Sequence, residues 1–387
     1  MKTMSRLYDL QKFCRTECDW LIDTTEALVR LESPTTDKAA VDRCGRELAS
    51  RLETIGGRVT RLSRPDRGDH LLAEFGCGSS QILLLGHFDT VWPIGQLEHM
   101  PLTRTDGRLH GPGVFDMKAG IAIGMLAARA LLETGAPPAH RIVMLWTADE
   151  EEGSGTSRAA IEDEARRSDA VLVLEPALPG GAVKTSRKGC GAYEVIVHGV
   201  AAHAGIEPQK GASAVQELAH LILKINALQD LEHGILANVV LVSGGRRSNV
   251  IPDEARAVVD VRVPTGADAQ RVDAAIRGLT TVDLRTTVSV SGGVERPPLE
   301  RSERVVRLYS RAREIARELG SELGEGGTGG GSDGNFTAAL GVPTLDGLGA
   351  VGDGAHALHE HVEIAALADR AALVAGLIAS LRPDQGR

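Results

Sequence analysis

Three runs of apolar residues in this chain lead into side chains that bind metal ions. Short continuous apolar runs are typical of buried strands in a parallel sheet. Ligands of open α/β sheets bind beyond the carboxyl ends of such strands. We therefore expect several strands to deliver imidazole and carboxylate groups to one crevice, which predicts a metal site, with two ions favoured over one. The runs are 82–86 before His87 and Asp89, 142–146 before the acidic residues 149–152, and 171–174 before Glu175.

Length and composition limit the classes of protein to consider. At 387 residues the chain exceeds the ~250–300 residues that one hydrophobic core usually serves, so two domains are expected. The 45 glycines and the aromatic content of 3% fit an α/β enzyme with many tight loops. The net charge of −9 argues against nucleic acid as the main partner, because phosphate binding needs a basic surface.

The sequence predicts neither a targeting segment nor a membrane segment. Residues 1–23 lack the apolar core of a signal peptide, and no segment approaches the ~18 consecutive apolar residues of a membrane span. The cysteines are odd in number and scattered, so free thiols and a cytoplasmic location are expected. They are Cys14, Cys18, Cys44, Cys77 and Cys190.

Strands and helices alternate along the first half of the chain, which predicts a mostly parallel sheet flanked by helices. Residues 7–55 are expected to be helical, with a break near Ser33-Pro34 and a helix cap at Asp37. A long helix is expected over 118–134. The expected strands are 57–63, 70–76, 82–87, 141–147 and 170–174.

A different pattern begins near residue 187. Residues 193–199 alternate apolar and polar side chains, as a half-exposed antiparallel strand does. The elements that follow have the order β-α-β-β-α-β of a ferredoxin-like α+β unit, with its last strand near 283–290 and its exit at Gly292-Gly293. We predict that this unit is inserted at 187–297, between two parts of a first domain, 1–186 and 298–387.

Each candidate ligand also has an ordinary structural interpretation. His87 and Asp89 point the same way on an extended segment, as a metal-bound imidazole and its carboxylate partner do, but a turn can also satisfy a strand-end histidine. Asp116, where a loop enters a helix, is suited to cap that helix. Glu175 and the acidic residues 149–152 are also compatible with a solvated surface.

Taken together, these residues favour a metal site. They coincide with strand ends and supply imidazole and carboxylate ligands without thiolate, which suits catalytic zinc, manganese or cobalt rather than a structural cysteine site. Three histidines in a late loop extend the choice of ligands, although surface exposure is their default interpretation. They are His356, His359 and His361.

The chain resembles the zinc-dependent metallopeptidases and deacylases that include carboxypeptidase G (glutamate carboxypeptidase), acetylornithine deacetylase, succinyl-diaminopimelate desuccinylase and aminoacylase. The resemblance covers nearly the whole chain, and its motifs agree in order and spacing. They are GHFDTV (86–91), GPGVFDMKAG (111–120), ADEEEGS (148–154), LEPA (174–177), AAHAG (201–205), SNVIPD (248–253), DVR (260–262), GGGSDGNF (329–336) and GAHALHE (354–360).

The resemblance implies a catalytic domain that holds two divalent ions, most often zinc, with cobalt and manganese as alternatives. His87 and Glu175 would bind the first ion. Glu151 and His356 would bind the second ion, and Asp116 would bridge both. This ligand set is an expectation carried over from the family's motifs.

Other residues receive roles from the same resemblance. Glu150 would be the general base, and Asp89 would be the partner of His87. Glu152 leaves open a slip of one residue in the acidic run. His359 is an alternative to His356, although the Gly-x-His setting and a Glu four residues later favour His356.

The inserted unit would act as a dimerisation or lid domain. His203 would reach the active site of the partner subunit and help to hold the oxyanion. Asn249 and Arg262 would bind the free carboxylate of the substrate, for which a bidentate arginine is well suited. The backbone of the glycine-rich loop 326–331, represented by Gly330, would line the substrate pocket.

The expected reaction is hydrolysis of an amide bond in a small peptide or an N-acyl amino acid, with release of the C-terminal amino acid. The glutamate carboxypeptidase-like branch fits best, and an N-acyl-amino-acid deacylase of the acetylornithine or succinyl-diaminopimelate type is the alternative. A single-metal enzyme is a further alternative. A catalytically silent binding protein of the same fold is remote, because Glu150 and all five ligands are present. We expect a homodimer, without nucleic acid or membrane as partners.

Overall fold

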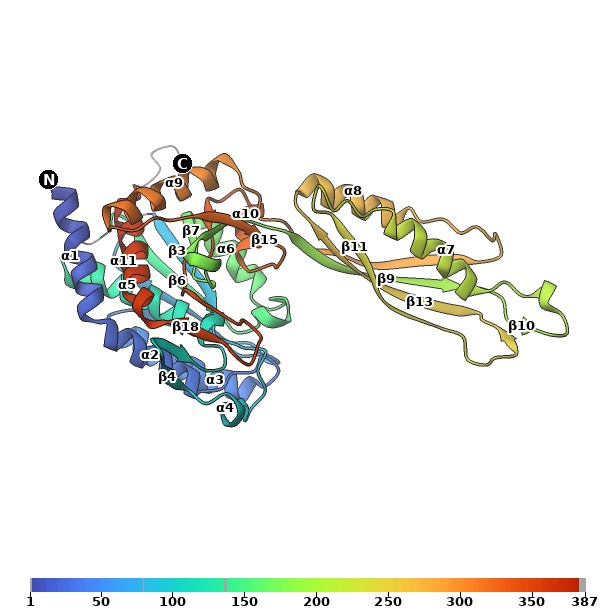
Figure 1. Ribbon diagram of the computed structural model, residues 1–387, viewed down its shortest axis with the longest axis horizontal. Coiled ribbons are helices and arrows are strands. Elements are labelled where there is room, and N and C mark those ends of the chain that lie inside the picture. The colour runs from blue at the N-terminus through green and yellow to red at the C-terminus, as the bar shows by residue number, and fades with distance from the viewer. Residues whose placement is uncertain (1, 79, 136–137, 383–387) are drawn as a thin grey trace. The chain divides into compact units, whose positions relative to one another are not determined.

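The computed structural model describes residues 2–78, 80–135 and 138–382. The chain forms two compact units (Figure 1). Unit 1 comprises residues 1–185, 301–327 and 332–387, and unit 2 comprises residues 186–300 and 328–331. The sequence prediction assigned residues 328–331 to the first domain, but the carbonyl oxygens of Gly330 and Gly331 accept hydrogen bonds from the Arg187 guanidinium of unit 2, at 3.2 and 3.0 Å.

Unit 1 is built on a six-stranded sheet of order β1-β2-β6-β3-β7-β16. The strands β6, β3, β7 and β16 are parallel, whereas β1 and β2 form an antiparallel edge. This arrangement confirms the prediction of a mostly parallel sheet. The strand bounds are β1 (Arg58–Leu62), β2 (His70–Phe75), β3 (Gln81–His87), β6 (Arg141–Thr147), β7 (Ser168–Val173) and β16 (Thr344–Leu345).

Helices cover both faces of this sheet, so alternate strand residues enter two separate cores (Figure 1). Ile82 and Leu84 of β3 pack with the helices α1, α2, α3, α5, α9 and α11, whereas Leu83 and Leu85 pack with α6 and α10. Burial on both faces explains why the strand reads as an unbroken apolar run. The helices are α1 (Lys2–Thr16), α2 (Cys18–Arg30), α3 (Lys38–Thr54), α5 (Ala119–Glu133), α6 (Arg158–Arg167), α9 (Glu303–Glu318), α10 (Gly334–Ala339) and α11 (Ile364–Ser380).

Short elements around the sheet connect the loops that follow its strands. A small four-stranded sheet of order β17-β18-β5-β4, which the sequence analysis did not predict, joins the late loop to the segment before Asp116. Asp37 caps α3 as predicted, because its carboxylate accepts the Ala40 N–H at 3.0 Å. The short elements are α4 (Gln96–His99), β4 (Thr103–Thr105), β5 (Arg108–His110), the turns η1 (Val114–Lys118), η2 (Glu150–Glu152) and η3 (Pro179–Gly181), β8 (Val183–Arg187), β15 (Glu325–Thr328), β17 (Gly352–Asp353) and β18 (His361–Glu363).

Unit 2 is an antiparallel four-stranded sheet of order β11-β13-β9-β14, with α7 and α8 packed on one face. This strand order and the connection β-α-β-β-α-β are those of a ferredoxin-like unit. Its elements are β9 (Gly189–His198), β10 (Ala202–His203), the turn η4 (Pro208–Lys210), α7 (Ala214–Asn226), β11 (Leu236–Gly244), β12 (Val250–Ile251), β13 (Glu254–Val263), α8 (Gly266–Arg277) and β14 (Thr287–Arg296).

The predicted end of unit 2 was wrong in one respect. Gly292 and Gly293 do not mark an exit but lie inside β14, which continues to Arg296. Gly292 has φ +84°, and a Cβ atom there would lie 2.1 Å from the carbonyl oxygen of Ala192 on β9. Glycine therefore permits a close approach of β14 to β9, a use of glycine that resembles a loop signal in sequence alone.

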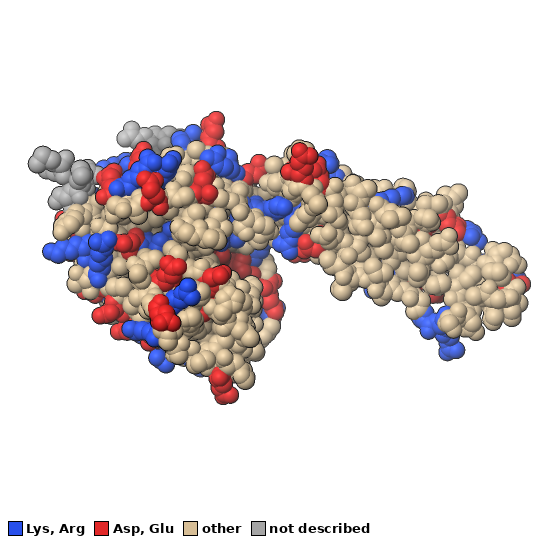
Figure 2. Space-filling view, in the orientation of Figure 1, with Lys and Arg blue, Asp and Glu red and all other residues tan. Residues whose placement is uncertain are grey.

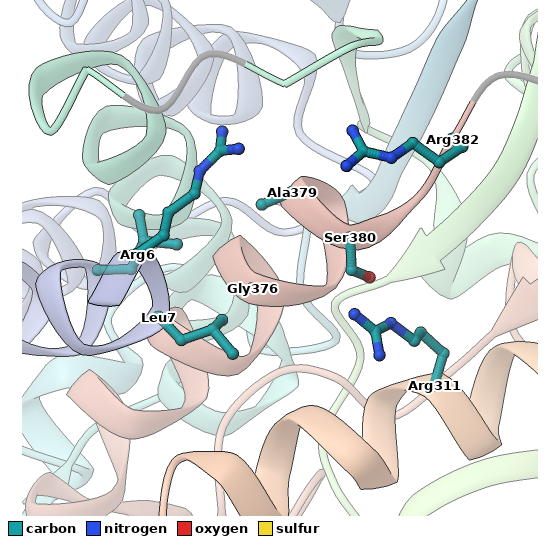
Figure 3. Close-up of a pocket in the computed structure, with 8 residues that line it drawn as sticks. Arg6, Leu7, Arg311, Gly376, Ala379, Ser380 and Arg382 are labelled. Carbon is teal, nitrogen blue, oxygen red and sulfur yellow. The ribbon is translucent and has the colours of Figure 1, made fainter. Parts of the chain in front are cut away.

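Among the described residues, no helix is both long enough and apolar enough to cross a lipid bilayer. All five cysteines are free thiols, and the cytoplasmic location stays a prediction. A pocket between α1, α9 and α11 is lined by Arg6, Arg311, Arg382 and Ser380 together with apolar residues (Figure 3), and no predicted site residue is among its described lining residues.

Candidate metal centre

The carboxyl ends of β3, β6 and β7 bring the predicted ligands to one edge of the sheet. His87 is the last residue of β3 and pairs in register with Thr147, the last residue of β6. The turn η2 (150–152) follows β6, and Glu175 follows β7 by two residues. Because these strands are parallel neighbours, the side chains that follow them meet although they are separated in the sequence.

Two imidazoles and three carboxylates make a continuous cluster in unit 1. The Nε2 atom of His87 lies 3.1 Å from Oδ1 of Asp116 and 3.5 Å from Oε1 of Glu175. The Nε2 atom of His356 lies 3.3 Å from Oδ2 of Asp116 and 3.2 Å from Oε2 of Glu151. Asp116 therefore presents one oxygen to each imidazole, the arrangement that a carboxylate between two cation positions requires.

The donor set fits divalent metal ions. His87, Asp116 and Glu151 each offer a ligand atom, and these atoms lie within 4.8 Å of one another. Oε1 of Glu151 is buried and has no hydrogen-bond partner among the described residues, which is costly for a carboxylate oxygen unless a cation compensates it. Nitrogen and oxygen donors without thiolate suit catalytic rather than structural zinc.

The protonation behaviour of the cluster follows from its charge balance. For His356, hydrogen bonds to Asp116 and Glu151 raise the pKa to about 10. Burial would raise the pKa of Asp116, but the imidazoles of His356 and His87 lower it below its ordinary value. Burial raises the pKa of Glu151. The ionised carboxylates are thus stabilised by positive charge placed between them, and a bound metal cation would supply such a charge.

Asp89 holds the turn that carries the acidic residues. This fully buried carboxylate accepts the backbone N–H groups of Glu150 at 3.3 Å and Glu151 at 3.2 Å, and the hydroxyl of Thr35 at 2.7 Å. The Nδ1 atom of His87 is closer to the main-chain oxygen of Asp89, at 3.0 Å, than to its carboxylate, at 3.5 Å. Asp89 is therefore placed to orient both His87 and η2.

Glu152 and His359, the alternatives to Glu151 and His356, lie outside the cluster. Glu152 forms an ion pair with Arg67, and its side chain is 37% exposed, whereas that of Glu151 is 7% exposed and contacts His356. His359 is exposed, and its nearest acidic oxygen, on Asp353, is 3.9 Å away. This geometry favours Glu151 and His356 over the shifted assignments.

The sequence analysis missed two residues that support this cluster. Thr35 was included only in a predicted helix break, yet its hydroxyl binds Asp89. Glu360 was used only to support the choice of His356, yet its buried carboxylate binds the loop of Asp116. The available signals were three hydroxyl residues around Pro34 and a single acidic residue four positions after His356, and neither is specific.

Unit 2 places the other predicted residues in two separate positions. His203 on β10 is exposed and lies close to Asn249. The Ala204 N–H donates to the Asn249 carbonyl at 2.9 Å, and the Gly205 N–H donates to Nδ1 of His203 at 3.1 Å. Arg262 on β13 makes a bidentate ion pair with Asp260, at 3.0 and 2.8 Å. Asp260 thus occupies the Nε and Nη2 edge of the Arg262 guanidinium.

Comparison with known proteins adds a family relationship. Residues 83–380 match the profile of "Peptidase family M20/M25/M40". Carboxypeptidase G2 from Pseudomonas sp. (strain RS-16) is 32% identical over 93% of this chain and 89% of its own length. Succinyl-diaminopimelate desuccinylase from Xanthomonas oryzae pv. oryzae is 30% identical over 93% of this chain and 98% of its own.

Solved structures show the same fold. Aminopeptidase PepT from Bacillus cereus superposes with a TM-score of 0.80 at 24% identity, over 94% of this chain and 98% of its own. The YXEP protein from Bacillus subtilis, described as a dinuclear metal binding peptidase from the M20 family, superposes with a TM-score of 0.70 at 14% identity, over 94% and 98% of the two chains.

Proposed function

Because the chain belongs to peptidase family M20/M25/M40, we propose that it is a dinuclear metal-dependent hydrolase that releases the C-terminal amino acid of its substrate, in the manner of a glutamate carboxypeptidase. The family membership confirms the resemblance on which the sequence analysis relied, and with it the class of metallopeptidase or amidohydrolase. The observation that carries the proposal is the position of Asp116, with one oxygen 3.1 Å from His87 and the other 3.3 Å from His356.

The five clustered side chains would hold two divalent ions. His87 and Glu175 would bind the first, Glu151 and His356 the second, and Asp116 would bridge them. When bound, such ions lower the pKa of a shared water and polarise the carbonyl of the scissile amide. Zinc is the proposed metal, because imidazole and carboxylate ligands without thiolate are those of catalytic zinc sites, with cobalt or manganese as alternatives.

Glu150 would act as the general base. Its backbone N–H is fixed on Asp89, so its carboxylate projects from the same turn that presents Glu151 to the cluster. Glu150 would take a proton from the attacking water and deliver it to the leaving amine, which is the usual work of a carboxylate base. Asp89 would keep the imidazole of His87 in the orientation that leaves Nε2 directed at Asp116.

Substrate recognition would use unit 2. Arg262 and Asn249 would bind the free carboxylate of the substrate, and the backbone at Gly330 would line the pocket. Arg262 is 32% exposed at its side chain, and Asp260 holds its guanidinium in a fixed plane. A guanidinium held in this way can present a remaining edge to a second carboxylate.

We also propose that the chain is a homodimer whose partner subunit supplies His203. Unit 2 exposes apolar side chains on its edge strand β11, namely Val240, Leu241 and Val242, which are 53%, 65% and 59% exposed. Figure 2 shows few charged side chains on the visible face of unit 2. An exposed apolar edge strand favours pairing with another chain, and a two-fold arrangement would make both active sites equivalent.

The proposal is tested by metal analysis and a substrate panel. Protein loaded with zinc should retain about two ions per chain, more than the single ion of an ordinary catalytic zinc site. It should then be assayed on peptidyl and N-acyl amino acids with varied C-terminal residues. Preference for N-acyl or peptidyl glutamate supports the carboxypeptidase assignment.

Preference for acetylornithine or succinyl-diaminopimelate supports the deacylase alternative, for which the 30% identity to a desuccinylase is the supporting observation. No more than one ion would refute the dinuclear site, and no hydrolysis of any substrate would favour a silent binding protein.

A further inference from the structure

Glu360 is a carboxylate with an unusual set of partners. Its side chain lies in the late loop, four residues after His356, and the residue is 1% exposed. Oε1 accepts the backbone N–H groups of Phe115 at 2.9 Å and Asp116 at 3.0 Å. Oε2 accepts the backbone N–H of Gly113 and the indole N–H of Trp92, both at 2.9 Å. Four donors thus converge on one buried carboxylate.

These donors belong to segments that are far apart in the sequence. Three of them come from the segment 113–116, and Trp92 belongs to the loop that follows β3 after His87. The main-chain oxygen of Glu360 also accepts the N–H of Gly111, at 3.4 Å. Glu360 therefore joins the late loop, which carries His356, to the loop that carries Asp116.

The late loop itself is tightly turned. The Ala357 N–H binds the Gly354 carbonyl at 2.8 Å, and the Glu360 N–H binds the Ala357 carbonyl at 3.0 Å. His356 lies within this turn with φ +60°. A displacement of Glu360 would consequently be transmitted to His356 as well as to Asp116.

We propose that Glu360 is a positioning residue for the metal centre, and that the position formed by Asp116, Glu151 and His356 depends on it more than the position formed by Asp116, His87 and Glu175. This inference rests on the proposed dinuclear function. Two of the three ligands of the second position lie on loops that Glu360 connects. His87, by contrast, is the last residue of β3 and pairs with Thr147 of β6. Glu175 directly follows Leu174, whose N–H donates to the Leu85 carbonyl of β3 at 2.9 Å.

The test is a stepwise titration of the metal-free full-length chain with Zn²⁺ by calorimetry, repeated with Co²⁺ by visible absorption. In Glu360→Gln an amide N–H₂ replaces one acceptor oxygen and faces backbone N–H donors. The wild-type chain should bind two ions in distinguishable steps. Glu360→Gln should bind the first ion with unchanged affinity and the second roughly 10–100-fold more weakly, the usual effect of losing a residue that orients ligands. The Co²⁺ absorption of the second step should decrease accordingly.

A matched control and a graded variant separate positioning from general damage. Glu363→Gln removes a nearby exposed carboxylate and should leave both steps unchanged. Trp92→Phe removes one of the four donors to Glu360 but keeps the three backbone donors, so it should weaken the second step by a smaller factor than Glu360→Gln. Melting of the metal-free proteins reports the fold without the metal. If Glu360→Gln does not fold, Glu360→Asp retains the charge with a shorter reach and should weaken the second step by a smaller factor.

Three results would overturn the proposal. They are unchanged binding of both ions to Glu360→Gln, equal weakening of both steps together with a lower melting temperature of the metal-free protein, and selective weakening of the first step. A wild-type chain that does not bind two metal ions would instead refute the proposed function itself.

Discussion

Replacing each of three consecutive glutamates by glutamine should give three different phenotypes. Glu150, Glu151 and Glu152 occupy the single turn η2, but their surroundings differ. Glu151 lies 3.2 Å from Nε2 of His356 and has a buried, unpartnered oxygen. Glu152 pairs with Arg67 at the surface. Glu150 is fixed through its backbone N–H to Asp89.

The expected magnitudes follow from these surroundings. Glu150→Gln should bind metal and substrate normally but lower kcat by roughly 10²–10⁴-fold, the range for loss of a general base. Glu151→Gln should weaken metal binding by at least the roughly 10–100-fold that loss of an orienting residue costs, because it removes a ligand itself. Glu152→Gln should change stability by less than about 1 kcal/mol, because its ion pair is about one-third exposed on both sides.

The assay combines metal content after dialysis with kcat at saturating metal and the melting temperature of each variant. Glu152→Gln is the internal control, since it removes the same charge from the same turn. The reasoning would be refuted if Glu151→Gln kept its metal but lost turnover, or if Glu152→Gln lost metal. Either result would shift the functional assignment of the acidic run by one residue.

Three further predictions concern the partner subunit, the packing and the pH dependence. Mixing Glu150→Gln chains with His203→Ala chains should restore part of the activity, because one site of a mixed dimer is then wild type; no recovery after demonstrated subunit exchange would exclude action of His203 across the interface. Gly120→Ala should lower stability by about 1–3 kcal/mol in urea unfolding, because its Cβ would lie 2.0 Å from the carbonyl oxygen of Leu174; an unchanged midpoint would contradict this packing. Burial raises the pKa of Asp69, but hydrogen bonds from the Arg64 backbone N–H and the Lys38 ammonium outweigh it and lower the pKa below its usual value. The free energy of unfolding should therefore exceed that of Asp69→Asn by its full amount above about pH 5, and this difference should decline as the pH falls through 4 towards 3. A difference that grows on acidification would contradict the assignment.

The amino-acid sequence determined the strands of the six-stranded sheet of unit 1 and the place of its candidate ligands along them. The run 141–147 was predicted with the bounds that β6 has, because a strand buried on both faces needs a short unbroken apolar segment. His87 and Glu175 could be recognised because parallel strands end at one edge, a rule that depends on connectivity rather than on side-chain packing.

Register and glycine use were harder to predict. The end of β14 was missed because Gly292 serves a close approach between two strands, and the sequence does not say which backbone a glycine faces. The choice between Glu151 and Glu152 depends on Arg67, which lies far away in the sequence and contacts only one of them. Pattern analysis treats neighbouring carboxylates as equivalent, whereas burial distinguishes them.

Tertiary structure alone decided the geometry of the centre. The approach of Asp116 to His87, 29 residues before it, and to His356, 240 residues after it, requires separate loops to be placed within about an ångström. The buried carboxylates of Asp89 and Glu360 fix those loops through backbone N–H groups. Every residue except proline carries such an N–H, so the sequence can show where a carboxylate stands but not which donors the folded chain will turn towards it.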